Sequence, residues 1–256
     1  MKPPRASIRG AVITLESNKL EEIMLRLREM RLPEMANQLI TMYEADEMKD
    51  VETVLDVMTQ AELISRKNNT ADRYRKAAHL SQIYAELSEI DYTPERKINE
   101  RIIDQLSSGS YIGKARNVVI VGACGTGKTY IANALASDAC RKLHRTLYCR
   151  MFEMISDIKH MESQRIKRRY ISPDVLVIDD FANVRMSEDE ALQIFKVMEY
   201  RYGHKSTIIA SQLDPEEWHR NFGASLLADS ILDRIVSNSY KIILSGDSLR
   251  PKNIVD

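Results

Sequence analysis

Residues 117–129 read NVVIVGACGTGKT, and residues 130–136 continue as YIANALA. The apolar run that opens this stretch has the composition of a buried strand, and the residues that close it favour a helix. Between them stands the spacing GxxxxGK[ST], in the strand–loop–helix context that gives this spacing its meaning. The stretch therefore predicts a strand, a phosphate-binding loop and a helix in direct succession.

The predicted loop has the residue types that hold a polyphosphate. Its glycines let backbone N–H groups curl around phosphate oxygens, and the new helix points its positive end at the same charge. Lys128 reaches the β- and γ-phosphate oxygens, and the Thr129 hydroxyl ligates Mg²⁺. We predict that a nucleoside triphosphate binds here; a glycine-rich turn that binds nothing is the alternative. The phosphate-binding residues are then Gly122, Ala123, Cys124, Gly125, Thr126, Gly127, Lys128 and Thr129.

Strand-like and helix-like segments alternate beyond this loop, which predicts an α/β fold: a parallel sheet flanked by helices. Upstream, apolar residues recur at three- and four-residue steps, and glycine is absent between Gly10 and Gly109, as expected for an all-helical module. We divide the chain into a flexible leader (1–17), a helical module (18–90) and an α/β domain (91–256). The predicted strands are 117–121, 146–150, 174–179, 206–210 and 240–244.

Composition restricts the class of protein. Lys plus Arg and Asp plus Glu both number 37, so nucleic acid can be bound only through a local basic patch. Three cysteines without close pairing suggest a reducing compartment, and Cys124 reads as a small filler of the loop. The sequence has no stretch long enough for a membrane span and no apolar leader, so we expect a cytoplasmic protein with no membrane partner.

A second group of polar residues supplies what hydrolysis needs. Asp179 and Asp180 follow the apolar residues VLVI, and in a parallel sheet they emerge at the carboxyl edge, where ligands bind. We predict that Asp179 is the Mg²⁺ partner and that Asp180 is the base or polariser of the attacking water. Gln212 is the predicted sensor of the γ-phosphate, with Ser211 as second candidate. Polar turns at the strand ends are the alternative.

Basic residues gather before the third predicted strand. Arg165, Lys167, Arg168 and Arg169 fall within five residues, and Lys159 lies a turn or two earlier. On a helix Arg165, Arg168 and Arg169 share one face, and such a face neutralises DNA phosphates without reading sequence. A solvated charged face is the alternative.

Arg234 lies in a further amphipathic helix, LADSILDRI, at residues 227–235. From this place it can reach the γ-phosphate held by a neighbouring subunit and stabilise the transition state. Spacing alone favours a surface pair with Asp229 or Asp233.

The ordered set of motifs resembles the IstB/DnaC group of AAA+ ATPases, and most closely the IstB-type transposition helper proteins. The resemblance runs from about Leu20 to the C-terminus, and beyond the phosphate loop only the order of its pieces is specific. These pieces are LRLREMRLPEMA (25–36), SSGSYI (107–112), VIDDF (177–181), ASQLDPEEW (210–218), LADSILDR (227–234) and GDSLR (246–250).

The resemblance implies a P-loop AAA+ core that binds ATP and Mg²⁺, self-associates into an oligomer on duplex DNA, and helps a transposase to choose or engage its target. Arg234 matches the family's trans-acting arginine, and the basic segment matches a helix that faces nucleic acid. The helical module matches a region for assembly or partner contact. A DnaC-like helicase loader and an ATP-gated scaffold with little hydrolysis stay open as alternatives.

Some residues depart from the family pattern. Asp180 stands where many AAA+ proteins have Glu, and its shorter side chain predicts slow hydrolysis. Gln212 stands where Asn is common. Few residues follow Arg250, so we expect no full helical lid, and the role of Arg250 stays open.

Overall fold

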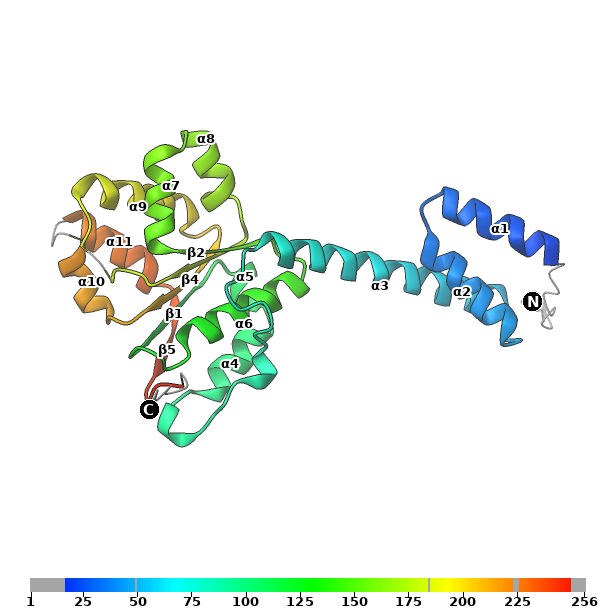
Figure 1. Cartoon of the computed structure of the whole chain (residues 1–256), viewed down its shortest axis with the longest axis horizontal. Coiled ribbons are helices and arrows are strands. Elements are labelled where there is room, and N and C mark those ends of the chain that lie inside the picture. The colour runs from blue at the N-terminus through cyan, green and yellow to red at the C-terminus, as the bar shows by residue number, and fades with distance from the viewer. Residues whose placement is uncertain (1–16, 49, 184, 223–225, 250–256) are drawn as a thin grey trace, which may run out of the picture. The chain divides into compact units, whose positions relative to one another are not determined.

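The computed structural model describes residues 17–48, 50–183, 185–222 and 226–249 of the chain. It divides into two compact units, Met1–Thr70 and Ala71–Asp256, and Figure 1 shows the elements of both. The predicted leader, apart from Ser17, and Arg250 lie outside the described residues. None of the helices in the described part is long and apolar enough to cross a membrane.

The first unit is helical, as its apolar periodicity predicts. It holds α1 (Ser17–Glu29), α2 (Pro33–Glu44) and the first part of α3 (Val51–Ala77). A buried acid joins α3 to α2: the Glu62 carboxylate accepts the N–H groups of Glu34 and Met35, 2.9 and 3.4 Å away, at the start of α2. The core residues are Leu20, Leu27, Ala36, Leu39, Met42, Met48, Val54 and Met58.

The second unit is built on a five-stranded sheet of order β2-β3-β4-β1-β5, in which every pairing is parallel. The order places β4 between β1 and β3, so the residues after these three strands meet at one edge. All five predicted strands are present within one residue at each end. They are β1 (Asn117–Gly122), β2 (Thr146–Arg150), β3 (Val175–Asp179), β4 (Ser206–Ser211) and β5 (Ser239–Leu244).

Helices cover both faces of this sheet, and the alternation of side chains along each strand decides which face a residue joins (Figure 1). Val118 and Ile120 pack with α6 (Lys128–Arg141) and α4 (Glu100–Ser107). Val119 and Val121 pack against the opposite layer. That layer consists of α7 (Met151–His160), α9 (Glu188–Arg201), α10 (Pro215–Asn221) and α11 (Leu226–Val236).

The boundary between the units lies earlier than the sequence predicted, after residue 70 and not after residue 90. Ala78, Leu80 and Ile90 are buried in the same core as α6, so the segment after α3 packs with the sheet. Between α3 and β1 the chain forms short helices: η1 (Leu87–Glu89), η2 (Pro94–Arg96), α4 and α5 (Ser110–Gly113).

The basic segment is not one continuous helix. After α7 the chain breaks at Met161, then forms α8 (Ser163–Ile166) and a π-helical turn, η3 (Lys167–Ile171). The wider turn of a π-helix changes the spacing on which the prediction of one shared basic face depended. The buried guanidinium of Arg201, in α9, fixes the end of this turn through the carbonyl oxygens of Tyr170, Ile171 and Pro173, at 2.9 to 3.2 Å.

Candidate nucleotide-binding site

The phosphate loop connects β1 to α6 and needs its glycines. Gly125 and Gly127 have φ angles of 82° and 94°, in the left-handed region that favours glycine. A Cβ atom on Gly127 would also lie 2.6 Å from the guanidinium of Arg96, and one on Gly125 would lie 2.1 Å from the Ser248 hydroxyl. Arg96 and Ser248, which lie far from the loop in the sequence, therefore pack closely against these two glycines.

The reactive side chains of the loop point to the edge of the sheet. The Lys128 ammonium group is buried and donates to the carbonyl oxygen of Ala123 at 2.7 Å, in the same loop. The Thr129 hydroxyl donates to Oδ2 of Asp179 at 2.8 Å. The predicted Mg²⁺ pair, Thr129 and Asp179, therefore lies in direct contact, although the two residues belong to different elements.

The two acids after β3 have different surroundings. Asp179 is 3% exposed, and its Oδ1 accepts the backbone N–H of Asp180 at 2.9 Å. Asp180 is half-buried, has a positive φ of 53°, and receives a hydrogen bond from the Asn183 amide at 3.2 Å. The left-handed turn at Asp180 reverses the chain directly after the strand, and both acids line the same cavity.

The structure separates the two sensor candidates. The Ser211 hydroxyl is buried, donates to the carbonyl oxygen of Phe181 at 2.7 Å, and accepts from the Trp218 indole at 2.9 Å. Through these bonds the Ser211 hydroxyl connects the segment after β3 to α10. Gln212 is exposed and lines the cavity with Asp180.

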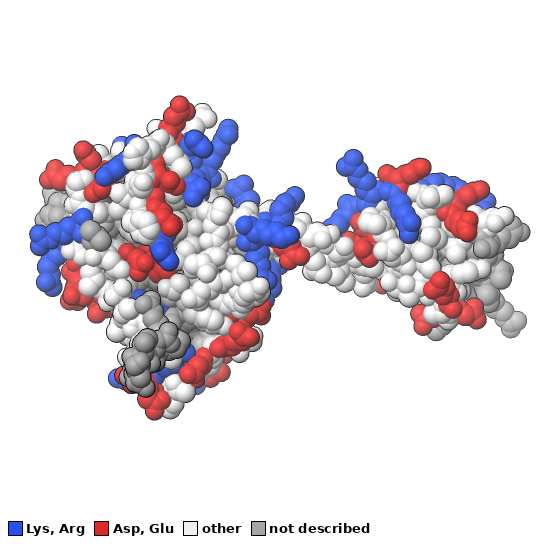
Figure 2. Space-filling model, in the orientation of Figure 1, with Lys and Arg blue, Asp and Glu red and all other residues white. Residues whose placement is uncertain are grey.

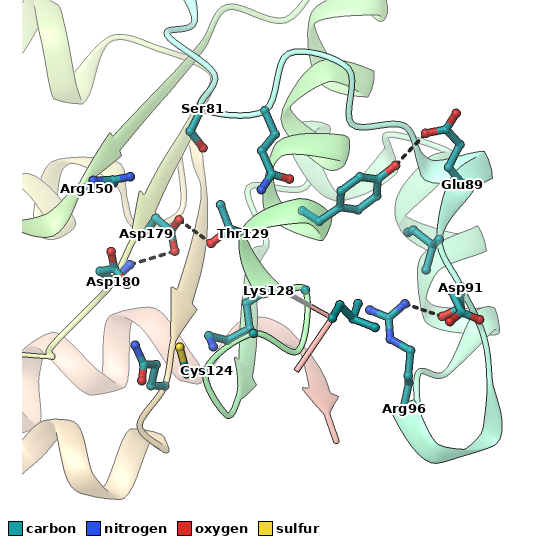
Figure 3. A pocket seen from close by; sticks show the side chains of 17 residues that line it. Ser81, Glu89, Asp91, Arg96, Cys124, Lys128, Thr129, Arg150, Asp179 and Asp180 are labelled. Carbon is teal, nitrogen blue, oxygen red and sulfur yellow. Dashed lines mark hydrogen bonds between the residues drawn. The ribbon is translucent and has the colours of Figure 1, made fainter. Parts of the chain in front are cut away.

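These residues surround a cavity of about 630 Å³ (Figure 3). In Figure 3 Asp179, Asp180 and Arg150 lie on one side of Lys128 and Thr129, and Glu89, Asp91 and Arg96 lie on the other. The sequence analysis assigned no site role to the other residues that line the cavity, because most of them lie outside the phosphate loop and the strand ends. These residues are Ser81, Gln82, Glu89, Ile90, Asp91, Arg96, Tyr130, Arg150 and Leu249.

The lining suits a nucleotide polyphosphate with Mg²⁺. Lys128, Arg96 and Arg150 supply positive charge, and the loop supplies backbone N–H groups. The described residues contain no cluster of three or more His, Cys, Asp or Glu that could hold a metal ion alone. Mg²⁺ is usually bound through one or two protein groups together with substrate phosphates and water, and the hydroxyl of Thr129 and the carboxylate of Asp179 could supply those groups.

Arg234 is not among the residues that line this cavity. It is half-buried on α11, forms an ion pair with Glu199 of α9, and stacks on Phe195 with 4.8 Å between the guanidinium carbon and the ring centre. The surface pair with Asp229 or Asp233 that spacing favoured is therefore wrong: Asp229 pairs with His219 at 3.0 Å.

The five predicted DNA-binding cations lie at the α7–α8 end of the second unit, where Figure 2 shows basic side chains beside acidic ones. Two of them have acidic partners: Lys159 pairs with Glu190 at 2.7 Å, and Arg169 pairs with Asp157 at 3.0 Å. Arg165, Lys167 and Arg168 are exposed and form no ion pair within the described part of the chain. Of the five predicted cations, these three present a charge to solvent that no acidic partner among the described residues compensates.

Comparison with known proteins places the sequence beside insertion-sequence proteins. The sequence model of the family described as IstB-like ATP binding protein matches residues 25–255. An insertion sequence ATP-binding protein of Sinorhizobium fredii is 34% identical over 166 residues, which cover 63% of this chain and 68% of the relative. The IS21 ATP-binding protein of Pseudomonas aeruginosa is 27% identical over 239 residues, which cover 92% and 89%.

Solved structures agree on the fold. The crystal structure of the DnaC helicase loader superposes with a TM-score of 0.53 at 19% identity, over 63% of this chain and 97% of that one. At this identity the similarity shows the fold alone, a parallel sheet flanked by helices as the motifs predicted, and nothing about activity or partner.

Proposed function

The chain belongs to the IstB-like ATP-binding protein family of AAA+ ATPases, and we propose that it acts in the cytoplasm as an oligomeric, DNA-binding helper of a transposase. The observation that supports this most is the meeting of Lys128, Thr129, Asp179, Asp180 and Gln212 around one cavity. That site belongs to a chain whose relatives are named as ATP-binding proteins of insertion sequences.

The residues divide the work of hydrolysis among them. Lys128 and the loop N–H groups would hold the β- and γ-phosphates, and Thr129 and Asp179 would hold Mg²⁺, which supplies positive charge to the phosphate oxygens. Asp180 and Gln212 line the same cavity, where Asp180 would orient the attacking water and Gln212 would contact the γ-phosphate. The carboxylate of Asp180 is one methylene shorter than that of Glu, so its reach to the water is reduced and turnover is slow.

A second copy of the chain completes the site. The site just described holds no arginine that faces the γ-phosphate from α11, because Arg234 lies outside its own cavity. We propose that Arg234 leaves Glu199 and enters the site of a neighbouring subunit, where its charge stabilises the transition state. ATP would then control assembly, and Arg165, Lys167 and Arg168 would contact the phosphates of duplex DNA without reading sequence.

Electron microscopy of the protein with duplex DNA tests this proposal. In the presence of ATP, we expect wild-type protein and Asp180→Asn to form a ring or spiral that encloses DNA, and Lys128→Ala to form none. Particles that stay monomeric for wild type and both variants would contradict the proposal. Retention of a transposase, but not of a replicative helicase, on the immobilised protein would distinguish the transposition helper from a helicase loader.

A further inference from the structure

Tyr148 lies beside the magnesium pair but belongs to neither motif. It is on β2, where its register partner on β3 is Val177, two residues before Asp179. Because side chains two residues apart share a face of the sheet, Tyr148 and Asp179 point the same way. The Tyr148 hydroxyl donates to Oδ2 of Asp179 at 2.8 Å, and its side chain is 5% exposed.

The direction of this bond follows from the chemistry of the two groups. An ionised carboxylate can only accept, so the Tyr148 hydroxyl is the donor and its proton lies toward Asp179.

Three donors converge on the carboxylate of Asp179. Oδ2 accepts from Thr129 and Tyr148, and Oδ1 accepts the backbone N–H of Asp180. The Thr129 hydroxyl is itself a ligand candidate for Mg²⁺, so its bond to Asp179 can be given up when the metal binds. The bonds from Tyr148 on β2 and from the Asp180 backbone hold the two carboxylate oxygens without Thr129, and Tyr148 is the only side-chain donor of the two.

We propose that Tyr148 is a positioning residue for the Mg²⁺ site, and that it acts by orienting the carboxylate of Asp179. This inference rests on the proposed function, since it assumes that Mg²⁺ binds beside Thr129 and Asp179. Residues that hydrogen-bond to a metal-binding carboxylate typically change metal affinity by about 10- to 100-fold when they are removed.

Tyr148→Phe removes the hydroxyl and keeps the ring, and Tyr111→Phe is a matched control. Tyr111 is also buried in the second unit, at 1% exposure, but its hydroxyl has no hydrogen-bond partner among the described residues. The control therefore separates the loss of a buried hydroxyl from the loss of the bond to Asp179.

The measurement is the binding of a fluorescent ATP analogue, in EDTA and across a titration with Mg²⁺. For Tyr148→Phe we expect unchanged affinity in EDTA and a roughly tenfold higher Mg²⁺ concentration at half-effect. Tyr111→Phe should titrate as wild type. In an Asp179→Asn background, Tyr148→Phe should add no further shift, because the partner through which it acts is gone.

The outcomes distinguish this inference from the function beneath it. A folded Tyr148→Phe protein with the Mg²⁺ titration of wild type would overturn the positioning role alone. An equal shift in the Asp179→Asn background would also overturn it, since Tyr148 would then act by another route. Wild-type protein whose ATP binding does not respond to Mg²⁺ would overturn both the positioning role and the proposed site.

Discussion

The phosphate loop and the basic segment at 159–169 both carry cations that we propose to bind phosphate groups, and they hold those cations in different ways. In the loop, Lys128 bonds to Ala123, five residues away, and the backbone between them shapes the site. In the basic segment, Lys159 pairs with Glu190 on another helix, and the turn that follows is fixed by Arg201.

The difference shows which kinds of site a single sequence reveals. A site formed by one contiguous stretch of backbone can be recognised from the spacing of its residues, since the residues that position each group are its sequence neighbours. A surface patch depends on which acids fold against it, and these come from anywhere in the chain. Removing one charge from the loop should therefore cause a large loss of nucleotide affinity. In the basic segment, the effect of removing a cation on DNA affinity should depend on whether that cation has an acidic partner.

The largest effect should come from the loop itself. Lys128→Ala removes the buried ammonium group of the phosphate loop, so nucleotide affinity should fall by about 1,000-fold or more. Fluorescent nucleotide titration measures this directly. Lys142→Ala is the control, because Lys142 follows the other end of the same helix and pairs with Asp138. Affinity within a few-fold of wild type in Lys128→Ala would remove the site assignment.

Arg234→Ala tests whether Arg234, which lies outside the nucleotide cavity of its own chain, acts at the cavity of a neighbouring subunit. Nucleotide affinity should be unchanged, and DNA-stimulated hydrolysis should fall by about 1,000-fold, the effect of losing a trans-acting arginine. Glu199→Gln is the informative companion, because it releases Arg234 from its ion pair. If Arg234 acts in trans, Glu199→Gln retains or gains activity. Equal losses in the two variants would mean that the ion pair itself is what matters.

The same distinction explains which features of the fold and the site could be predicted from the sequence. Continuous apolar runs identified β1 and β3, VVIV and VLVI, because strands buried on both faces show no alternation of polar and apolar residues. The unit boundary could not be read, because Ala78 and Leu80 reveal their packing against α6 only once the chain has folded. Tyr148 was missed since its partner, Asp179, lies across a strand pairing that one sequence does not specify.

Arg201 tests whether the basic segment depends on a distant anchor. Arg201→Met leaves the carbonyl oxygens of Tyr170, Ile171 and Pro173 buried without a donor, which should cost about 3 kcal/mol of unfolding free energy. Chemical denaturation measures this cost. Arg201→Lys, which keeps the charge but loses the fork, should recover only part of it.

The pH dependence of this cost checks the charge state of Arg201. Burial lowers the pKa of Arg201 to about 9, below its unfolded value, so the group makes stability rise with pH only above about 9. Below that pH both states are protonated and its contribution is constant. The difference between wild type and Arg201→Met should therefore not change between pH 6 and 8, and a clear slope there would show that the guanidinium is not the anchor.

The smallest effects should come from the basic segment, and they should be unequal. Neutralising Arg165, Lys167 and Arg168 together should reduce the slope of log affinity for duplex DNA against log salt by about 2 to 3, since each phosphate contact contributes about 0.9. Neutralising Lys159 and Arg169 should change it by less than about 1, because Glu190 and Asp157 already compensate these charges. Equal changes per charge would mean that DNA displaces the ion pairs, and an unchanged slope in both variants would mean that this face does not bind DNA.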